Sequence, residues 1–126
     1  MIAADTSSLI AYLHGEQGAD VEAVERAMAL DELRLPPPVV SELLGSQSAD
    51  VEKLLAGVPR IELAQGFWER AGRTRALVLS RGLKARLADA LIAQCCIDAG
   101  ASLVCRDTDF RHFARWGGLK LAVEFL

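Results

Sequence analysis

The sequence predicts an α/β fold in which a mainly parallel sheet is flanked by helices. Short apolar segments of strand length alternate along the chain with longer segments whose apolar residues recur at helical spacing. This alternation is typical of parallel strands, because a parallel pair needs a long crossover connection. The 126 residues, 52% of them hydrophobic, suffice for one core and show no repeat or low-complexity linker. We therefore expect a single domain over residues 1–126.

The first strand and helix are expected at the start of the chain. Residues 1–4 form an apolar run, and polar residues follow at once before the apolar stretch 9–13. A strand followed directly by helix-capping residues predicts a strand–turn–helix junction, with Thr6 or Ser7 as the cap. Asp5 is then expected at the carboxyl end of a strand, the edge at which α/β folds bind their ligands.

The next elements lead to a helix that carries an acid. Residues 21–28 combine apolar side chains at helical spacing with charged ones, which predicts an amphipathic surface helix. A short strand is expected at 33–35. The three prolines 36–38 should interrupt regular structure before a helix that begins at Val39. Glu42 lies beside the buried side of that helix.

The second half of the chain continues the alternation of helices and strands. Residues 85–99 predict a helix with almost no polar face, in which Asp89 is the exception. Asp107 follows an apolar strand expected at 102–105. The remaining expected elements are helices over 49–56 and 67–78, a strand over 60–63, a helix carrying Phe110 and Phe113, and a last strand over 119–123.

Four carboxylates stand inside or at the ends of apolar segments, where acids are rare. They are Asp5, Glu42, Asp89 and Asp107. A buried ionised carboxylate costs several kcal/mol unless it is paired, hydrogen-bonded or bound to a cation, so four of them favour one shared cation site. Oxygen ligands without a histidine or thiolate cage favour Mg²⁺ or Mn²⁺. Because such an ion can polarise a phosphodiester and activate water, phosphodiester hydrolysis is the expected reaction.

Each acid also has a purely structural interpretation. Asp5 could cap the helix that follows it, and Glu42 could be an exposed residue on a surface helix. Asp89 could be neutralised by Arg86, three residues earlier on the same helix. The last structural alternative is a helix cap at Asp107 or Asp109.

The net charge of the chain limits how it can bind nucleic acid. A formal net charge of −3 argues against coating nucleic acid by bulk electrostatics, but permits an acidic metal site with local basic residues. Basic residues do lie near two of the acids, although ordinary solvated helix surface explains them equally well. The candidates for holding substrate phosphates are Arg81, Lys84, Arg86 and Arg106.

Neither a membrane location nor disulfide bonding is indicated. Apolar runs are too short to cross a bilayer and the opening residues lack a signal-peptide pattern, so a cytoplasmic protein is expected. Cys95, Cys96 and Cys105 lie in apolar surroundings without a CxxC pair. We therefore expect reduced, buried thiols.

Three stretches of the chain carry a resemblance to a known family. They are ADTSSLIAYL at the start, VVSELL in the middle and LADALIAQCCIDAGASLVCRDTDFRHF near the end. These stretches resemble the PIN domain, particularly the VapC-type toxins of bacterial toxin–antitoxin pairs. The resemblance spans nearly the whole chain, in order and in spacing. It implies a three-layer domain, metal-dependent endoribonuclease activity, a homodimer, and inhibition by an antitoxin whose C-terminal segment occupies the active-site groove.

The resemblance also implies roles for individual residues. The four carboxylates would be the catalytic acids and the ligands of Mg²⁺ or Mn²⁺. Supporting roles would fall to Thr6, Ser7 and Asp109. One position departs from the family pattern: Cys105 stands where such chains commonly have threonine, so a hydroxyl that could orient Asp107 is missing. We expect this change to tune the site without abolishing it.

Three alternative functions can be compared with this one. A Mg²⁺-dependent phosphoryl-transfer enzyme of the haloacid dehalogenase type needs a second acid two residues after the first, where this chain has Ser7. A response-regulator receiver needs an acceptor aspartate after a central strand, and residues 61–64 supply none. A PIN-like protein that only binds partners remains open, although all four acids are present.

Overall fold

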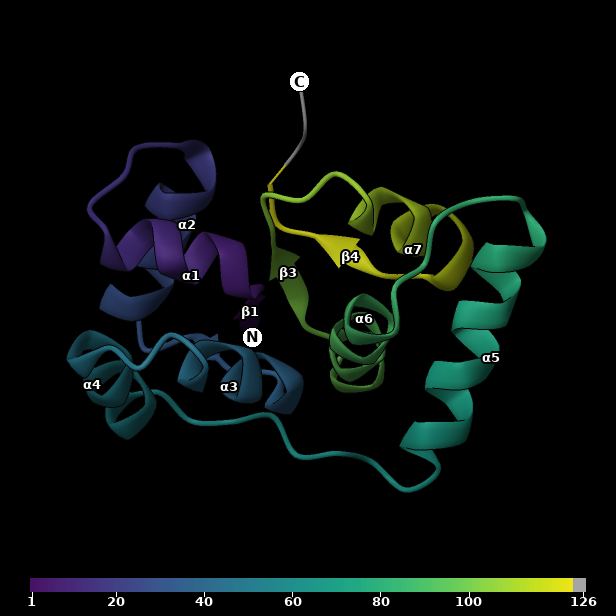
Figure 1. Ribbon diagram of the computed structural model, residues 1–126, viewed down its shortest axis with the longest axis horizontal. Coiled ribbons are helices and arrows are strands. Elements are labelled where there is room, and N and C mark those ends of the chain that lie inside the picture. Colours follow the sequence, from purple (N-terminus) through teal and green to yellow (C-terminus); the bar gives the residue numbers. More distant parts are fainter. Residues whose placement is uncertain (124–126) are drawn as a thin grey trace.

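Four short strands form one parallel sheet in the computed structural model, which describes residues 1–123 (Figure 1). Their order across the sheet is β2-β1-β3-β4. The central pair aligns Ile2 with Ser102 and Ala4 with Val104. Because all pairs are parallel, the carboxyl ends of the strands lie at one edge of the sheet. The strands are β1 (Ile2–Ala4), β2 (Leu33–Arg34), β3 (Ser102–Val104) and β4 (Lys120–Leu121).

Helices connect the strands and cover the sheet. In Figure 1, α1 and α2 lie to one side of β3, and α5, α6 and α7 lie to the other. This arrangement confirms the predicted α/β fold with a parallel sheet flanked by helices. The helices within the described residues are α1 (Thr6–Leu13), α2 (Ala19–Ala29), α3 (Pro37–Leu44), α4 (Ala49–Gly57), α5 (Phe67–Ser80), α6 (Leu87–Ala99) and α7 (Phe110–Gly117).

The helix α6 is the centre of the packing. It contacts α3, α5, α7 and β3, which explains why its sequence is apolar on nearly every side. Leu9 of α1, Leu43 of α3, Ile92 of α6 and Phe113 of α7 are each buried to 2% exposure or less. These helices therefore meet through side chains that leave little freedom for movement, and each acid of interest lies on or next to one of them.

The strand predicted over residues 60–63 is wrong. Only Arg60 forms a bridge, pairing with Leu35, and of the segment only Ile61 is buried. The N–H of Ile61 donates to the carbonyl of Leu35 at 2.9 Å, but the residue that would donate next in a parallel ladder is Pro37, which has no N–H and begins α3. The alternation of polar and apolar residues over 60–63 therefore does not mark a strand; within this segment only the side chain of Ile61 packs into the core.

Several predicted boundaries also shift, for local reasons. The helix expected from Val39 begins at Pro37, because prolines are tolerated in the first turn, where an N–H has no helical partner. The helix expected from residue 85 begins at Leu87. The last strand pairs only over Lys120–Leu121. Its predicted end, residue 123, is the last described residue, and no helix of residues 1–123 is long and apolar enough to cross a membrane.

Candidate active site

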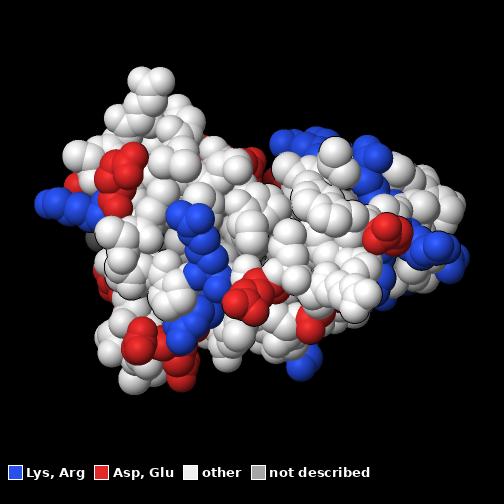
Figure 2. Space-filling view, turned by 90° about the horizontal axis from the view of Figure 1, so that it is seen from below, with Lys and Arg blue, Asp and Glu red and all other residues white. Residues whose placement is uncertain are grey.

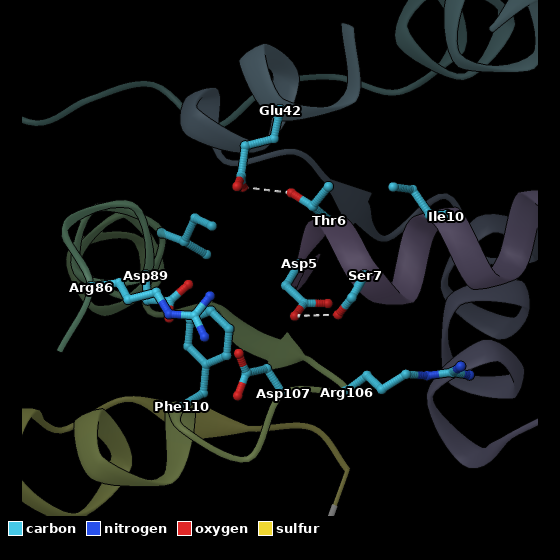
Figure 3. Close-up of a pocket in the computed structure, with 11 residues that line it drawn as sticks. Asp5, Thr6, Ser7, Ile10, Glu42, Arg86, Asp89, Arg106, Asp107 and Phe110 are labelled. Atoms are coloured by element: carbon cyan, nitrogen blue, oxygen red, sulfur yellow. Dashed lines mark hydrogen bonds between the residues drawn. The ribbon is translucent and has the colours of Figure 1, made fainter. Parts of the chain in front are cut away.

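A pocket of about 390 Å³ opens at the carboxyl edge of the sheet, between α1, α3, α6 and the loop before α7 (Figure 3). This edge is where open α/β sheets bind ligands. Side chains from segments far apart in the sequence come together there. The pocket is lined by Asp5, Thr6, Ser7, Ile10, Glu42, Arg86, Asp89, Ile92, Arg106, Asp107 and Phe110.

Asp5 is fixed by the junction between β1 and α1. Its main-chain N–H donates to the carbonyl of Val104 at 2.9 Å, and its side chain caps α1 by accepting from the N–H of Ser8 at 3.0 Å. Asp5 is thus the cap, not Thr6 or Ser7 as predicted; the Ser7 hydroxyl instead donates to Asp5 Oδ2 at 2.9 Å. Burial raises the pKa of Asp5, although these hydrogen bonds oppose the shift. The cap interpretation is therefore correct, and the same carboxylate also lines the pocket.

Glu42 is brought to the pocket by α3. The hydroxyl of Thr6 donates to Glu42 Oε1 at 2.7 Å, across a sequence separation of 36 residues. Glu42 is exposed, as its structural interpretation also required. Its carboxylate nevertheless has a defined position, because the hydroxyl that holds it belongs to the first turn of α1.

Asp89 is the least satisfied acid of the pocket. Its Oδ2 atom is buried and has no hydrogen-bond partner among residues 1–123. Burial, then the charge of Asp107, raises the pKa of Asp89 to about 6, while Arg86 acts in the opposite direction and Glu42 adds to the rise. The charge of Arg86 is therefore insufficient to neutralise Asp89. Repulsion from the other carboxylates therefore adds to the effect of burial on this pKa.

Asp107 and Asp109 differ in position. Asp107 lines the pocket, and its Oδ1 accepts from the N–H of Asp109 at 2.8 Å. Asp109 precedes α7 without a side-chain cap hydrogen bond, and its carboxylate lies 3.7 Å from Nζ of Lys84. The N–H of Asp109 thus orients Asp107 from the main chain, next to the buried Cys105. Burial raises the pKa of that thiol, which keeps it protonated.

The donors of this pocket fit a divalent metal ion. Within residues 1–123, no group of three or more His, Cys, Asp or Glu side chains is already arranged to hold a metal. Mg²⁺, however, is commonly bound through one or two carboxylates while it keeps several waters. The buried, unpartnered oxygen of Asp89, together with carboxylates that raise its pKa, is the environment that a cation would relieve.

The four basic candidates have different surroundings. Arg86 lines the pocket, and Lys84 lies near Asp109. The guanidinium of Arg81 stacks over Trp116, 4.1 Å from the ring centroid. Arg106 lines the pocket but its guanidinium hydrogen-bonds to other residues of the chain. On the face shown in Figure 2, basic side chains form separate patches with acidic and uncharged side chains between them, in keeping with the small net charge.

Sequence reasoning missed the partners of Arg106. Its guanidinium contacts Asp20, a residue of α2 that lies 86 positions away and is buried. Nothing in the sequence distinguishes Asp20 from an ordinary acid in the first turn of an amphipathic helix. The only available signal was Gly18, two residues earlier, at a position where a glycine breaks the apolar pattern.

Comparisons with known proteins agree with this fold. The family model described as PIN domain matches residues 2–115. The structure of VapBC2 from Rickettsia felis bound to a DNA fragment from its promoter contains a chain that is 21% identical, with a TM-score of 0.71, covering 96% of this chain and 97% of that one. FitAcB from Neisseria gonorrhoeae gives 17% identity and a TM-score of 0.69, covering 96% of both chains.

A third match is to FitAB bound to an IR36 DNA fragment. It has 17% identity, a TM-score of 0.71 and 99% coverage of both chains. No curated protein sequence matches the chain. At these identities the structural matches establish the fold.

Proposed function

Because the chain belongs to the PIN domain family, we propose that it is a metal-dependent endoribonuclease that acts as the toxin of a toxin–antitoxin pair. PIN domain toxins are generally nucleases. The observation that carries the proposal is the pocket in which Asp5, Glu42, Asp89 and Asp107 come together, with one buried oxygen of Asp89 left without a partner. Four unrelated structural acids would each be expected to have their own partner.

Asp5, Asp89 and Asp107, together with Glu42, would hold Mg²⁺ or Mn²⁺. When bound, such an ion supplies Lewis acidity toward a phosphodiester oxygen and lowers the pKa of a bound water molecule. The protein's own contribution is to direct these carboxylates into the pocket. Ser7 and the N–H of Ser8 do this for Asp5, and the hydroxyl of Thr6 does it for Glu42.

The substrate is a polyanion, so cations must bind its phosphates near the acids. Arg86 is the candidate for the phosphate closest to the pocket, because it lines the pocket wall. Lys84 and Arg81 precede Arg86 in the sequence and would contact phosphates farther along the RNA. Arg106 is also a candidate, although hydrogen bonds within the chain occupy most of its guanidinium donors. Ile10, Ile92 and Phe110 supply the apolar part of the lining.

The proposed partners follow from the same family membership. Two of the matched structures bear the names of two-component complexes, VapBC2 and FitAB, and both are bound to DNA. By similarity we propose that this chain forms a homodimer and pairs with a cognate antitoxin that inhibits it. A small reading frame directly upstream that encodes such an antitoxin would support the pairing.

The decisive experiment is cleavage of total RNA by the purified chain, freed of any antitoxin. We expect cleavage with Mg²⁺ or Mn²⁺, no cleavage in EDTA, and loss of cleavage in Asp5→Asn and Asp89→Asn. Cleavage in EDTA, or undiminished cleavage by both variants, would overturn the proposal. An inactive wild-type chain that still binds its antitoxin would instead support the alternative of a PIN-like binding protein.

A further inference from the structure

Arg106, the residue before Asp107, is anchored by four hydrogen bonds within the chain. Its Nε and Nη2 donate to the two carboxylate oxygens of Asp20, at 2.9 Å and 3.1 Å. Nη1 donates to Glu16 Oε1 at 3.2 Å, and Nη2 also donates to the carbonyl of Gln17 at 3.4 Å. Because a guanidinium has five N–H donors, this side chain has most of its donors occupied before any substrate arrives.

The acceptor Asp20 is a buried carboxylate whose pKa is lowered by this contact. Its side chain is 9% exposed, and its Oδ2 also accepts from the Ser8 hydroxyl at 2.9 Å. Burial alone would raise the pKa of Asp20, but the hydrogen bonds from Arg106 and Ser8 outweigh it and hold the pKa below its ordinary value. The N–H of Ser8 donates to the side chain of Asp5. Asp20 and Asp5 are therefore both bonded to Ser8, in the first turn of α1.

Gly18 leaves the space that the ion pair needs. Its φ is +151°, a conformation that favours glycine, and a Cβ at this position would lie 2.6 Å from Asp20 Oδ1 and 3.3 Å from Arg106 Nη2. A side chain at the start of α2 would therefore displace the carboxylate of Asp20 and crowd the guanidinium of Arg106.

The same pair is connected to the pocket through the main chain. The N–H of Arg106 stabilises the ionised form of Asp5, whose own N–H donates to Val104. Arg106 lies in a bend that follows β3, directly before Asp107. Figure 3 shows that the two side chains diverge, with Asp107 directed toward the acids and Arg106 directed away toward α2. Fixing Arg106 on one side therefore sets the direction of Asp107 on the other.

We propose that the Asp20–Arg106 ion pair, in the space left by Gly18, positions Asp107 and Asp5 in the acidic pocket. Arg106 and Asp20 are positioning residues, because they act through the two pocket acids. The kinetic part of this inference rests on the proposed nuclease function, whereas the anchoring of the loop 105–109 does not.

A second pair of the same chemistry supplies the control. Arg70 donates from Nε and Nη2 to Asp98 at 3.0 Å and 2.6 Å, and a Cβ on Gly66 would lie 2.7 Å from Arg70 Nη1. This pair joins α5 to α6 and contributes no residue to the pocket lining. Removing this pair should lower the stability of the fold, as removal of the Asp20–Arg106 pair does, but should not displace the acids of the pocket.

The experiment compares Asp20→Asn and Gly18→Ala with Asp98→Asn and Gly66→Ala in the purified full-length chain. We expect the first two variants to lower kcat on RNA with Mn²⁺ about 100-fold with KM within about threefold, because a small misplacement of reacting groups has effects of this size. They should also speed amide hydrogen exchange at 105–109 and reduce the rise in Tm that Mn²⁺ causes. The control variants should lower Tm while kcat and exchange at 105–109 stay within about threefold of wild type.

Wild-type kcat and wild-type exchange at 105–109 in Asp20→Asn would overturn the proposal, since the pair would then serve stability alone. If wild type cleaves no RNA, the proposed function fails, and the exchange rates at 105–109 still decide the positioning role. If Asp20→Asn does not fold, Arg106→Lys replaces it: this variant keeps the charge, loses the bidentate geometry, and should show the same faster exchange.

Discussion

Two arginine–aspartate pairs of nearly equal geometry occur in this molecule, one beside the pocket and one between α5 and α6. The aspartate side chains are 9% and 13% exposed, for Asp20 and Asp98, and the arginine side chains 38% and 41%, for Arg106 and Arg70. Each arginine reaches its partner through two nitrogens, and each pair lies against a glycine at the start of a helix. The chemistry of the two pairs is therefore matched.

The two pairs differ in what they connect. The Arg70–Asp98 pair joins α5 and α6, whose packing against each other is already extensive. Gln94 also donates to Asp98 at 2.9 Å, within α6 itself. The Asp20–Arg106 pair joins α2 to the loop that carries Asp107, in which the N–H of Asp109 also donates to Asp107. Two ion pairs of matched geometry can therefore differ in their functional consequence, because the segments that they fix carry different residues.

The largest expected difference between the two regions concerns the acids themselves. Asp107→Asn should lower the rate of RNA cleavage about 1000-fold, or roughly 4 kcal/mol, because it removes a charge that stabilises the transition state. Asp98→Asn should leave the rate within about threefold. Initial rates on a labelled RNA at saturating Mn²⁺ measure both, and equal rates for the two variants would contradict the assignment of the pocket as the active site.

A second difference should appear in the pH dependence of stability without metal. The pKa of Asp89 is raised from 3.8 to about 6, which means that ionisation of this carboxyl destabilises the fold. The destabilisation is complete above about pH 6 and absent below about pH 3.8. Asp89→Asn should therefore melt several degrees higher than wild type at pH 7.5 in EDTA, with the advantage shrinking as the pH falls through 6 toward 4.

The Arg70–Asp98 region should show the opposite sign. The hydrogen bond from Arg70 is the main cause that lowers the pKa of Asp98, so the stabilisation by this carboxylate is present above pH 3.8 and is lost as the pH falls below it. Asp98→Asn should melt lower than wild type from pH 7.5 down to about 4. Glu25→Gln, an exposed position on α2, serves as the control. A lower Tm for Asp89→Asn at pH 7.5 would show that Asp89 serves the fold.

A smaller effect is expected from the hydroxyl that holds Glu42. Thr6→Val keeps the shape of the side chain and removes the donor to Glu42 Oε1. We expect kcat to fall about fivefold to tenfold, the equivalent of one hydrogen bond. Ser80→Ala removes a comparable hydroxyl from α5, where Ser80 donates to the carbonyl of Leu77, and should not change kcat. Equal effects of the two changes would remove Glu42 from the proposed site.

The smallest effect concerns the binding of phosphate. Arg86→Ala should reduce the slope of log affinity against log salt by about 0.7, the value for one phosphate contact on single-stranded nucleic acid. Arg73→Ala, an exposed position on α5, should leave the slope unchanged. RNA-binding titrations with catalytically inactive Asp89→Asn as the background would measure this, and an unchanged slope would make Arg86 an ordinary surface residue.

The sequence by itself was enough to predict the α/β class, the family resemblance, and the placement of Asp5 and Asp107 after strands. These features depend on local physics: the period of apolar residues, the chemistry of helix starts, and the restrictions imposed by glycine and proline. The failure at residues 60–63 has a cause outside that segment, because the ladder with Leu35 ends at Pro37, where α3 begins. The roles of the pocket acids remain predictions, although the structure brings all four to one pocket.

Only the tertiary structure decided which charges meet. Arg86 and Arg106 are both arginines close to a pocket acid in the sequence, yet one lines the pocket wall and the other reaches Asp20 across 86 residues. The buried, unpartnered oxygen of Asp89 likewise depends on how α6 packs against its neighbours. Burial and pairing are properties of the assembled core, and a pattern within one segment carries no information about which distant segment will cover it.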